Sequence, residues 1–278
     1  FYDIMSIETV GIYKPDSKVY EMPIKKYGCK PNNICFLSSN TWDVSGGGVF
    51  GYNAVWVNRF NKVFDKYDLM NDIMSLGSHR LWKKQMISWL SPNKNTVLLD
   101  MSSGTGDIAK LFLKHIKNKG TVYAVDSNAK MMEIAKKKLG KFKNIKWHLG
   151  SAEKLSFKDN YFDYYSISFG LRNTNNINHV LQEAYRVLRP GGRFICLEFS
   201  KIKNYNFKKL YDFYSKSIPK IGNIVVGDNQ PYEYLVKSIK NFYNQKELID
   251  LMKKNSFYKT EYRNLSGGIV AIHSGWKI

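Results

Sequence analysis

One stretch of the chain constrains its fold more than any other. It runs from Val97 to Ala109, begins as a buried-strand pattern, passes through a turn with Gly104 and Gly106, and continues as an amphipathic helix. The two glycines allow positive φ angles and a close approach of the backbone to a ligand. We expect Asp107 to cap the helix, whose first N–H groups are then free to face that ligand. The stretch therefore predicts a cradle for a nucleotide-containing molecule.

Two acidic residues help to distinguish the possible ligands. Residues 104–109 also fit the fingerprint of dinucleotide-binding proteins, because Asp126 closes the next strand about 20 residues later, where it can hold two ribose hydroxyls. Asp100 ends the first strand, where a carboxylate would repel a pyrophosphate and attract a cationic amino-acid or sulfonium group. Asp100, the glycine turn and Asp126 together resemble the S-adenosylmethionine site of class I methyltransferases.

The chain around this turn alternates strands and helices. We expect strands at 96–101, 121–126, 145–149, 162–168 and 193–199, and helices at 79–90, 107–118, 128–140 and 177–189. Such alternation implies an α/β fold with a mostly parallel sheet, in which ligands bind beyond the carboxyl ends of the strands. Two final runs, 258–263 and 269–273, predict an antiparallel pair, which is more typical of methyltransferases than of dehydrogenases. The expected architecture is a class I methyltransferase fold with a seven-stranded sheet flanked by helices.

The remaining segments suggest additions to this fold. Residues 1–48 are rich in Gly, Pro, Asn and Ser and show little periodicity, so we expect an N-terminal extension that is poorly ordered or concerned with targeting. The methyltransferase domain then spans 49–278. Apolar helical patterns at 57–90 predict lid or entry helices, and aromatic helical patterns at 204–243 predict inserted helices.

Charge and cysteine content limit the partners and the compartment. The chain has 43 Lys and Arg against 23 Asp and Glu, a net charge of +20 that favours an anionic surface, either nucleic acid or acidic lipid. No apolar run reaches the roughly 18 residues that a membrane span requires. Three cysteines without metal-ligand spacing, and five histidines without an HExxH motif, predict a reducing compartment and no metal.

Four further segments match one family, and they are 66–77, 168–173, 183–193 and 267–277. With the glycine turn, they resemble the quinone-biosynthesis C-methyltransferases, which act on polyprenyl benzoquinols and naphthoquinols. The resemblance extends from about Arg59 to Ile278, and the terminal segment is most similar to the mitochondrial benzoquinol methylases. Ser102 and Ser103 depart from the pattern, since the family usually has Ala-Gly there. We expect this change to tighten the turn and to lower the affinity for the cofactor.

The resemblance implies S-adenosylmethionine as the cofactor and assigns contacts to it. Thr105 would donate to the methionine carboxylate and Asp126 would accept from both ribose hydroxyls. Ser151 and Ala152 would frame the adenine edge, and Ser168 would border the reacting methyl group. The predicted cofactor site is completed by three residues of the first strand and the glycine turn, namely Asp100, Gly104 and Gly106.

The resemblance also implies three catalytic residues, Tyr67, Arg172 and Asn173. Methylation of a ring carbon requires an electron-rich phenol, and loss of the hydroxyl proton makes the ring a better nucleophile. Arg172 can stabilise the phenolate directly or through a water molecule, and it is a poor general base because a guanidinium is always cationic. Asn173 and Tyr67 would orient the quinol oxygens. Without the resemblance, Tyr67 would be interpreted as a core residue and Arg172 as one partner of a surface ion pair.

The substrate implied by the resemblance is a polyprenyl methoxy-benzoquinol of ubiquinone biosynthesis, with a demethylmenaquinol as the alternative. A homodimer, a complex with other quinone-biosynthesis enzymes and peripheral binding to the matrix face of the mitochondrial inner membrane are implied as well. An RNA methyltransferase is less favoured, because residues 168–170 lack the Asn/Asp-Pro-Pro-aromatic motif and no RNA-binding module is visible. We therefore expect no nucleic-acid partner.

Overall fold

The computed structural model describes residues 11, 16–38, 47–56, 75, 77–202, 204–205, 209 and 230–278. The chain divides into two compact units, Phe1–Asp65 and Lys66–Ile278. The predicted entry helices between 57 and 74 lie outside the described residues, as do residues 206–208 and 210–229 of the predicted inserted helices.

The first unit contains regular elements that the weak periodicity of its sequence does not predict. They are α1 (Ser17–Tyr27), η2 (Pro31–Asn33), β1 (Cys35–Ser38) and β2 (Asn53–Trp56). Asp16 caps α1 by accepting a hydrogen bond from the Lys18 N–H, and β1 pairs in parallel with β2. The rings of four residues pack together as a small aromatic cluster, namely Tyr20, Phe36, Phe50 and Tyr52. These elements are too short for their periodicity to stand out in the sequence.

The second unit is built around one sheet. Its helices are α5 (Ser78–Leu90), α6 (Asp107–His115), α7 (Ala129–Leu139), α8 (Ile177–Val187), α10 (Gln230–Asn241) and α11 (Gln245–Lys254). Its strands are β3 (Thr96–Met101), β4 (Gly120–Asp126), β5 (Ile145–Leu149), β6 (Phe162–Ser168), β7 (Leu188–Phe199), β8 (Tyr258–Leu265) and β9 (Val270–Trp276). Two short 3-10 helices complete it, η3 (Leu171–Asn173) and η4 (Ser266–Gly268).

The seven strands lie in the order β5-β4-β3-β6-β7-β9-β8. The first five are parallel, and β9 runs antiparallel to both β7 and β8. The predicted mostly parallel seven-stranded sheet and its terminal antiparallel pair are therefore confirmed.

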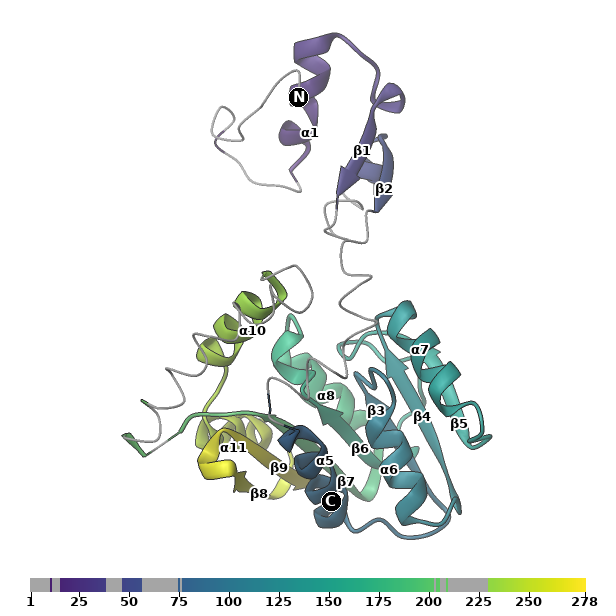
Figure 1. Cartoon of the computed structure of the whole chain (residues 1–278), viewed down its shortest axis with the longest axis vertical. Coiled ribbons are helices and arrows are strands. Elements are labelled where there is room, and N and C mark those ends of the chain that lie inside the picture. Colours follow the sequence, from purple (N-terminus) through teal and green to yellow (C-terminus); the bar gives the residue numbers. More distant parts are fainter. Residues whose placement is uncertain are drawn as a thin grey trace. The chain divides into compact units, whose positions relative to one another are not determined.

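Helices cover both faces of this sheet (Figure 1). On one face α5 and α6 bury a core that includes Trp82, Met86, Phe112 and Leu113. On the other face α8 and α11 bury a core that includes Val180, Leu181, Leu248 and Met252. Each such side chain contributes about 1.5–3 kcal/mol when it leaves water. The rigid sheet between these two cores sets the positions of the residues that follow the strands.

β7 begins five residues before its predicted start at 193. Helix α8 ends at Val187 because Leu188 adopts an extended conformation, with φ −69° and ψ 138°. Pro190 follows and has no N–H to continue a helix. The pairing of β6 with β7 includes a register shift between Phe162 and Tyr164, and this shift accommodates the early start of the strand.

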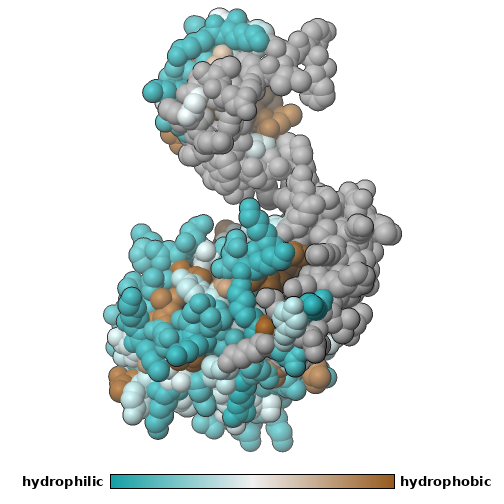
Figure 2. Space-filling view, turned by 90° about the vertical axis from the view of Figure 1, so that its left-hand side faces the viewer, coloured by the Kyte–Doolittle hydropathy of each residue, from teal (hydrophilic) through white to brown (hydrophobic). Residues whose placement is uncertain are grey.

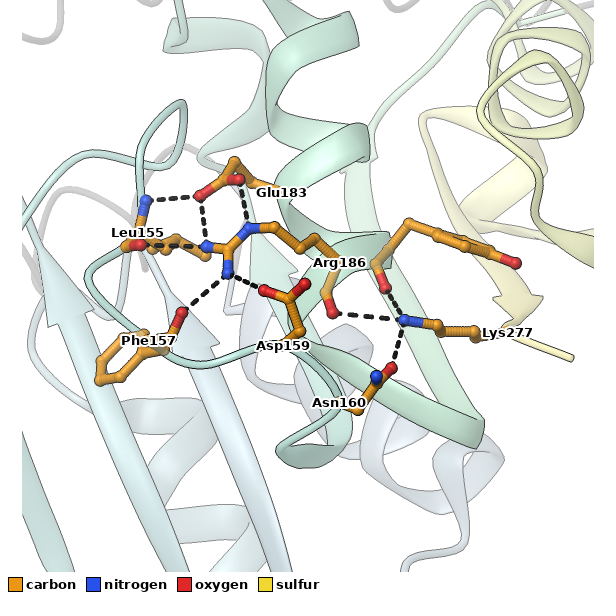
Figure 3. Close-up of polar contacts among 8 residues, drawn as sticks. Leu155, Phe157, Asp159, Asn160, Glu183, Arg186 and Lys277 are labelled. Carbon is orange, nitrogen blue, oxygen red and sulfur yellow. Dashed lines mark hydrogen bonds and ion pairs between the residues drawn. The ribbon is translucent and has the colours of Figure 1, made fainter.

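Arg186 at the end of α8 holds the loop between β5 and β6, residues 150–161 (Figure 3). Its Nε lies 2.7 Å from Glu183 Oε1, and its Nη1 lies 2.6 Å from Asp159 Oδ1. The guanidinium also donates to two carbonyl groups of the loop, those of Leu155 and Phe157. The loop that carries Ser151 and Ala152 is thus tied to the helical layer.

Candidate cofactor and catalytic site

The turn after β3 requires glycine at its last position. Gly106 has φ +79°, and a Cβ there would lie 2.5 Å from Leu139 Cδ1 and 3.4 Å from Trp147 Cη2. Gly104 has φ +53° and Ser102 has φ +54°. A residue other than glycine costs about 1–2 kcal/mol in the left-handed region, so Ser102 is strained. Gly170, two residues beyond β6, packs so closely on Ser102 that a Cβ would overlap it.

Asp107 does not cap the helix, and the prediction that it does is wrong. Gly106 occupies the N-cap position of α6 without a side-chain hydrogen bond, and Asp107 is the first helical residue. Its Oδ2 lies 2.9 Å from Lys83 Nζ and its Oδ1 lies 3.0 Å from Lys138 Nζ. Burial raises the pKa of Asp107, but the two ammonium groups outweigh burial and hold that pKa well below its usual range. Asp107 therefore ties α6 to α5 and α7.

Asp126 lies at the end of β4 and joins that strand to the glycine turn. Its Oδ2 accepts a hydrogen bond from the Gly104 N–H at 2.8 Å, and its Oδ1 accepts from the Asn128 N–H at 2.8 Å. The residue is buried, and burial raises the pKa of its carboxyl group. Each carboxylate oxygen has a further lone pair, so Asp126 can also accept from the hydroxyls of a ribose.

Asp100 is a buried carboxyl group with an unused acceptor. Its residue exposes only 1% of its surface, and the Ser166 hydroxyl donates to its Oδ1 at 2.8 Å from the neighbouring strand β6. Its Oδ2 is buried and has no hydrogen-bond partner among the described residues. Burial raises the pKa of Asp100 to about 7, although Ser166 and the charge of Lys83 both lower it. A buried polar atom of this kind calls for a partner, and a cationic ligand would supply one.

Two further predicted contacts lie at the same ends of the strands. Thr105 is buried in the glycine turn, with its Oγ1 3.5 Å from Lys138 Nζ. The hydroxyl of Ser168, at the end of β6, is buried and has no partner within the described part of the chain. Asp100, Thr105, Asp126 and Ser168 therefore occupy the carboxyl ends of three adjacent parallel strands, β4, β3 and β6, or the turn that follows them.

Ser151 and Ala152 follow β5 at the edge of the sheet. Ser151 is exposed, and its hydroxyl donates to the Glu153 carboxylate. Ala152 is buried among the apolar residues of the α8 face, so only its main chain can face a ligand. The Glu153 carboxylate also accepts from the Asn175 N–H at 2.9 Å, and this bond connects the loop to the segment after η3.

Arg172 lies in η3, a short distance after the end of β6 at Ser168, and its acidic partner is not among the residues predicted from the sequence. Its Nη1 lies 2.8 Å from Oε1 of Glu198, a residue near the end of β7. The Arg172 side chain exposes 8% of its surface and the Glu198 side chain exposes none. The Arg172 side chain is therefore almost completely buried in an ion pair, and does not lie on the open surface.

Arg172 and Asn173 meet at one carbonyl group. Arg172 Nη1 donates to the Phe169 carbonyl at 2.7 Å, and Asn173 Nδ2 donates to the same oxygen at 3.5 Å. Phe169 has φ +57°, a conformation that side chains disfavour. Strained backbone that brings two polar side chains together is typical of functional sites. Tyr67, the third predicted catalytic residue, lies outside the described residues.

Three residues of this region, Lys83, Ser166 and Glu198, were not identified from the sequence. Ser166 and Glu198 are polar residues inside apolar strand segments, and this is the signal that could have identified them. Among the described residues, no group of three or more His, Cys, Asp or Glu side chains is arranged to hold a metal ion.

Comparisons with solved structures agree with the fold. A methyltransferase of Thermotoga maritima is 21% identical and superposes with a TM-score of 0.56, covering 79% of this chain and 98% of its own. The phospholethanolamine N-methyltransferase 2 of Haemonchus contortus, solved with S-adenosylhomocysteine, is 14% identical with a TM-score of 0.52, covering 69% of this chain and 52% of its own. At these identities the similarity shows the fold alone.

Comparisons of sequence are more specific. The "Ubiquinone/menaquinone biosynthesis C-methyltransferase UbiE" of Rickettsia akari is 52% identical over 226 residues, which cover 79% of this chain and 91% of that protein. The protein of the same name from Rickettsia prowazekii is 51% identical over 244 residues, covering 82% and 98%. The model of the ubiE/COQ5 methyltransferase family matches residues 53–277. The chain therefore belongs to the ubiE/COQ5 methyltransferase family.

Proposed function

We propose that this protein transfers a methyl group from S-adenosylmethionine to a ring carbon of a polyprenyl methoxy-benzoquinol in ubiquinone biosynthesis. Membership of the family and the names of its relatives support this function. The observation that carries the proposal is the position of the Arg172–Glu198 pair, which lies at the ends of β6 and β7, beside the strand ends that carry the predicted cofactor contacts.

The residues present fit the cofactor. The unused Oδ2 of Asp100 and the unpartnered hydroxyl of Ser168 are buried polar atoms for which the described residues supply no partner. When bound, S-adenosylmethionine supplies an electrophilic methyl group on a sulfonium. Asp100 would attract its cationic end, Asp126 would accept from its ribose, and the predicted contacts in the glycine turn and the loop after β5 would hold the rest, namely Gly104, Thr105, Gly106, Ser151 and Ala152.

Arg172 would stabilise the phenolate form of the substrate. A quinol that loses a hydroxyl proton to water places negative charge on that oxygen and makes the ring a stronger nucleophile. A guanidinium held by a carboxylate is a cation and a hydrogen-bond donor, so Arg172 would stabilise this charge and not remove the proton. Asn173, which binds the same carbonyl as Arg172, would orient a quinol oxygen together with Tyr67.

A demethylmenaquinol is the second candidate substrate. The printed name of the Rickettsia relatives covers both ubiquinone and menaquinone biosynthesis. The two rings share the feature that the chemistry needs, a phenolic oxygen that can carry negative charge beside the carbon to be methylated. This candidate uses the same site residues.

Peripheral binding to an anionic membrane surface is part of the proposal, since the quinol carries a polyprenyl tail and the chain has a charge of +20. Among the described residues, no helix is long and apolar enough to cross a membrane. Figure 2 shows one side of the molecule, where hydrophilic residues cover most of the described surface of the second unit and hydrophobic residues form small groups. We place the protein on the matrix face of the mitochondrial inner membrane, as a homodimer within a complex of quinone-biosynthesis enzymes.

The proposed domain organisation has a targeting or extension segment at 1–48 and a methyltransferase domain at 49–278. Imaging of the full-length natural protein, with a fluorescent tag at its carboxyl end, tests the location. The proposal expects a mitochondrial signal, and a uniform cytosolic signal would contradict it.

A substrate comparison tests the activity. The protein is given S-adenosylmethionine with a labelled methyl group, together with a short-tailed methoxy-benzoquinol, a demethylnaphthoquinol or bulk RNA. The proposal expects label on the benzoquinol. Label on the naphthoquinol alone would favour the second candidate, and label on RNA alone would overturn both.

A further inference from the structure

Glu198 holds Arg172 at two points. Its Oε1 accepts a hydrogen bond from Arg172 Nη1 at 2.8 Å, and its Oε2 accepts from the Arg172 main-chain N–H at 3.3 Å. Its Oε1 also accepts from the Phe199 N–H at 2.9 Å. One buried carboxylate therefore connects the end of β7 to both the backbone and the guanidinium of a residue that follows β6.

The other contacts of the guanidinium leave it a single orientation. Nη1 uses its second hydrogen on the Phe169 carbonyl at 2.7 Å, so both of its hydrogens are engaged. The ring of Phe199 lies against the guanidinium, with 5.3 Å between Cζ and the ring centroid. Nε is buried and makes no hydrogen bond to the described residues. Because Nε is buried, the donor that remains for a substrate oxygen is Nη2, and the contacts of Nη1 set its direction.

The burial of Glu198 argues for a role other than stability. Removing a carboxylate from water costs several kcal/mol, and well-packed apolar residues often stabilise a fold as well as a buried ion pair does. The burial of Glu198 is better explained by its effect on the orientation of Arg172. It fixes a planar cation that must face a developing negative charge at short range.

We propose that Glu198 is the positioning residue that sets the direction of the Arg172 guanidinium toward the substrate oxygen. This inference rests on the proposed role of Arg172 in stabilising the phenolate. Glu198 touches neither substrate nor cofactor in this account, and it acts only through Arg172.

Glu198→Gln tests the proposal, since glutamine keeps the size and one acceptor but removes the charge. We expect kcat for the short-tailed quinol to fall about 10- to 100-fold, as for a displaced catalytic group, while the Kd for S-adenosylmethionine changes less than about twofold. Glu198→Asp keeps the charge but shortens the reach, and we expect a smaller loss of kcat. A wild-type kcat for Glu198→Gln would overturn the proposal.

A matched control is Asp163→Asn. Asp163 is also a buried carboxylate, at the amino end of β6, where its Oδ2 accepts from the Val97 N–H at 2.6 Å and its Oδ1 pairs with Arg189. We expect Asp163→Asn to lower the melting temperature without lowering kcat. An equal loss of kcat in the control and in Glu198→Gln would mean that Glu198 is merely structural, and would overturn the proposal.

A double-mutant cycle separates this inference from the proposed function. In an Arg172→Ala background, Glu198→Gln is expected to change kcat less than about twofold, because Glu198 affects the reaction only through the Arg172 guanidinium. If the double variant loses kcat by the product of the two single losses, Glu198 acts independently of Arg172, and the proposal is overturned. If Arg172→Ala alone keeps the wild-type kcat, the proposed function of Arg172 fails. If Arg172→Ala is slow and both Glu198 variants are fast, only the positioning role fails.

Discussion

The main-chain N–H of Gly104 donates to Asp126 Oδ2 at 2.8 Å, so the turn after β3 is bound to the end of β4 by a carboxylate. The second oxygen of Asp126 binds the N–H of Asn128, the residue that caps α7. One acid therefore organises both the turn and the helix that follows, and it can still accept from a ligand. This arrangement gives Asp126 two roles, one in the turn and one in the proposed binding of the cofactor.

Asp126→Ala is expected to weaken the binding of S-adenosylmethionine. Each lost hydrogen bond to a charged group contributes about 1.5–3 kcal/mol, so the Kd rises roughly 10- to 100-fold or more. Calorimetric titration measures this change. Asp250→Asn, on the exposed side of α11, serves as the control for loss of one carboxylate. An unchanged Kd for Asp126→Ala would remove the cofactor assignment.

Arg172→Ala is expected to lower kcat while the affinity for the cofactor stays close to that of the wild type. The guanidinium would stabilise charge that develops on the quinol, and loss of one such donor typically lowers kcat about 100- to 1000-fold. Arg172→Lys keeps the charge but not the planar donors, so we expect only partial recovery. Steady-state kinetics with the short-tailed quinol would show both effects, and wild-type turnover of Arg172→Ala would exclude its role in the transition state.

Asp100 makes stability depend on pH. Its pKa rises from an ordinary value of 3.8 to about 7 in the folded chain, mainly because of burial. Between these two values the folded state binds more protons than the unfolded state, so this group's contribution to stability is lost as the pH rises from about 4 to about 7. Thermal unfolding of the wild type and of Asp100→Asn across this window measures the effect. The variant should gain stability relative to the wild type as pH rises, and a constant difference would contradict the assignment.

The same group predicts a pH dependence of cofactor binding. A cationic ligand prefers the ionised form of Asp100, so the wild-type Kd for S-adenosylmethionine should fall as the pH rises from about 6 to about 8. In Asp100→Asn this dependence should be lost. A parallel pH dependence in both proteins would assign it to another group.

Binding to membranes is expected to weaken as salt rises. The attraction between a chain of charge +20 and acidic lipid is screened within about 10 Å at 0.1 M salt. Co-sedimentation with vesicles that contain or lack an anionic lipid measures this attraction. Equal binding to neutral vesicles at all salt concentrations would exclude electrostatic docking.

The strand ends that carry Asp100, Asp126 and Ser168 could be predicted, because the alternation of elements fixes a parallel sheet whose carboxyl ends meet at one edge. The role of Asp107 could not, since the cap and the first helical residue differ by one position and Lys83 and Lys138 come from other helices. Ion pairs between separate helices depend on how the helices pack, which the local sequence pattern does not show.

The pairing of Arg172 with Glu198 could not be predicted from the sequence, for the same reason. Glu198 lies 26 residues further along the chain and meets Arg172 only because β6 and β7 are neighbours in the sheet. An acid inside an apolar strand marks Glu198 as unusual, but the local pattern does not show which residue it pairs with. The sequence therefore predicts that Arg172 follows β6, but not that Glu198 holds its guanidinium.

The position of the new methyl group in the product tests the central claim most directly. A short-tailed methoxy-benzoquinol is incubated with the protein and with S-adenosylmethionine that carries a trideuterated methyl group, and the product is examined by mass spectrometry and NMR. The account predicts the deuterated methyl on a ring carbon with both hydroxyls free. A methyl ether on a quinol oxygen, with no carbon-bound label, would contradict it.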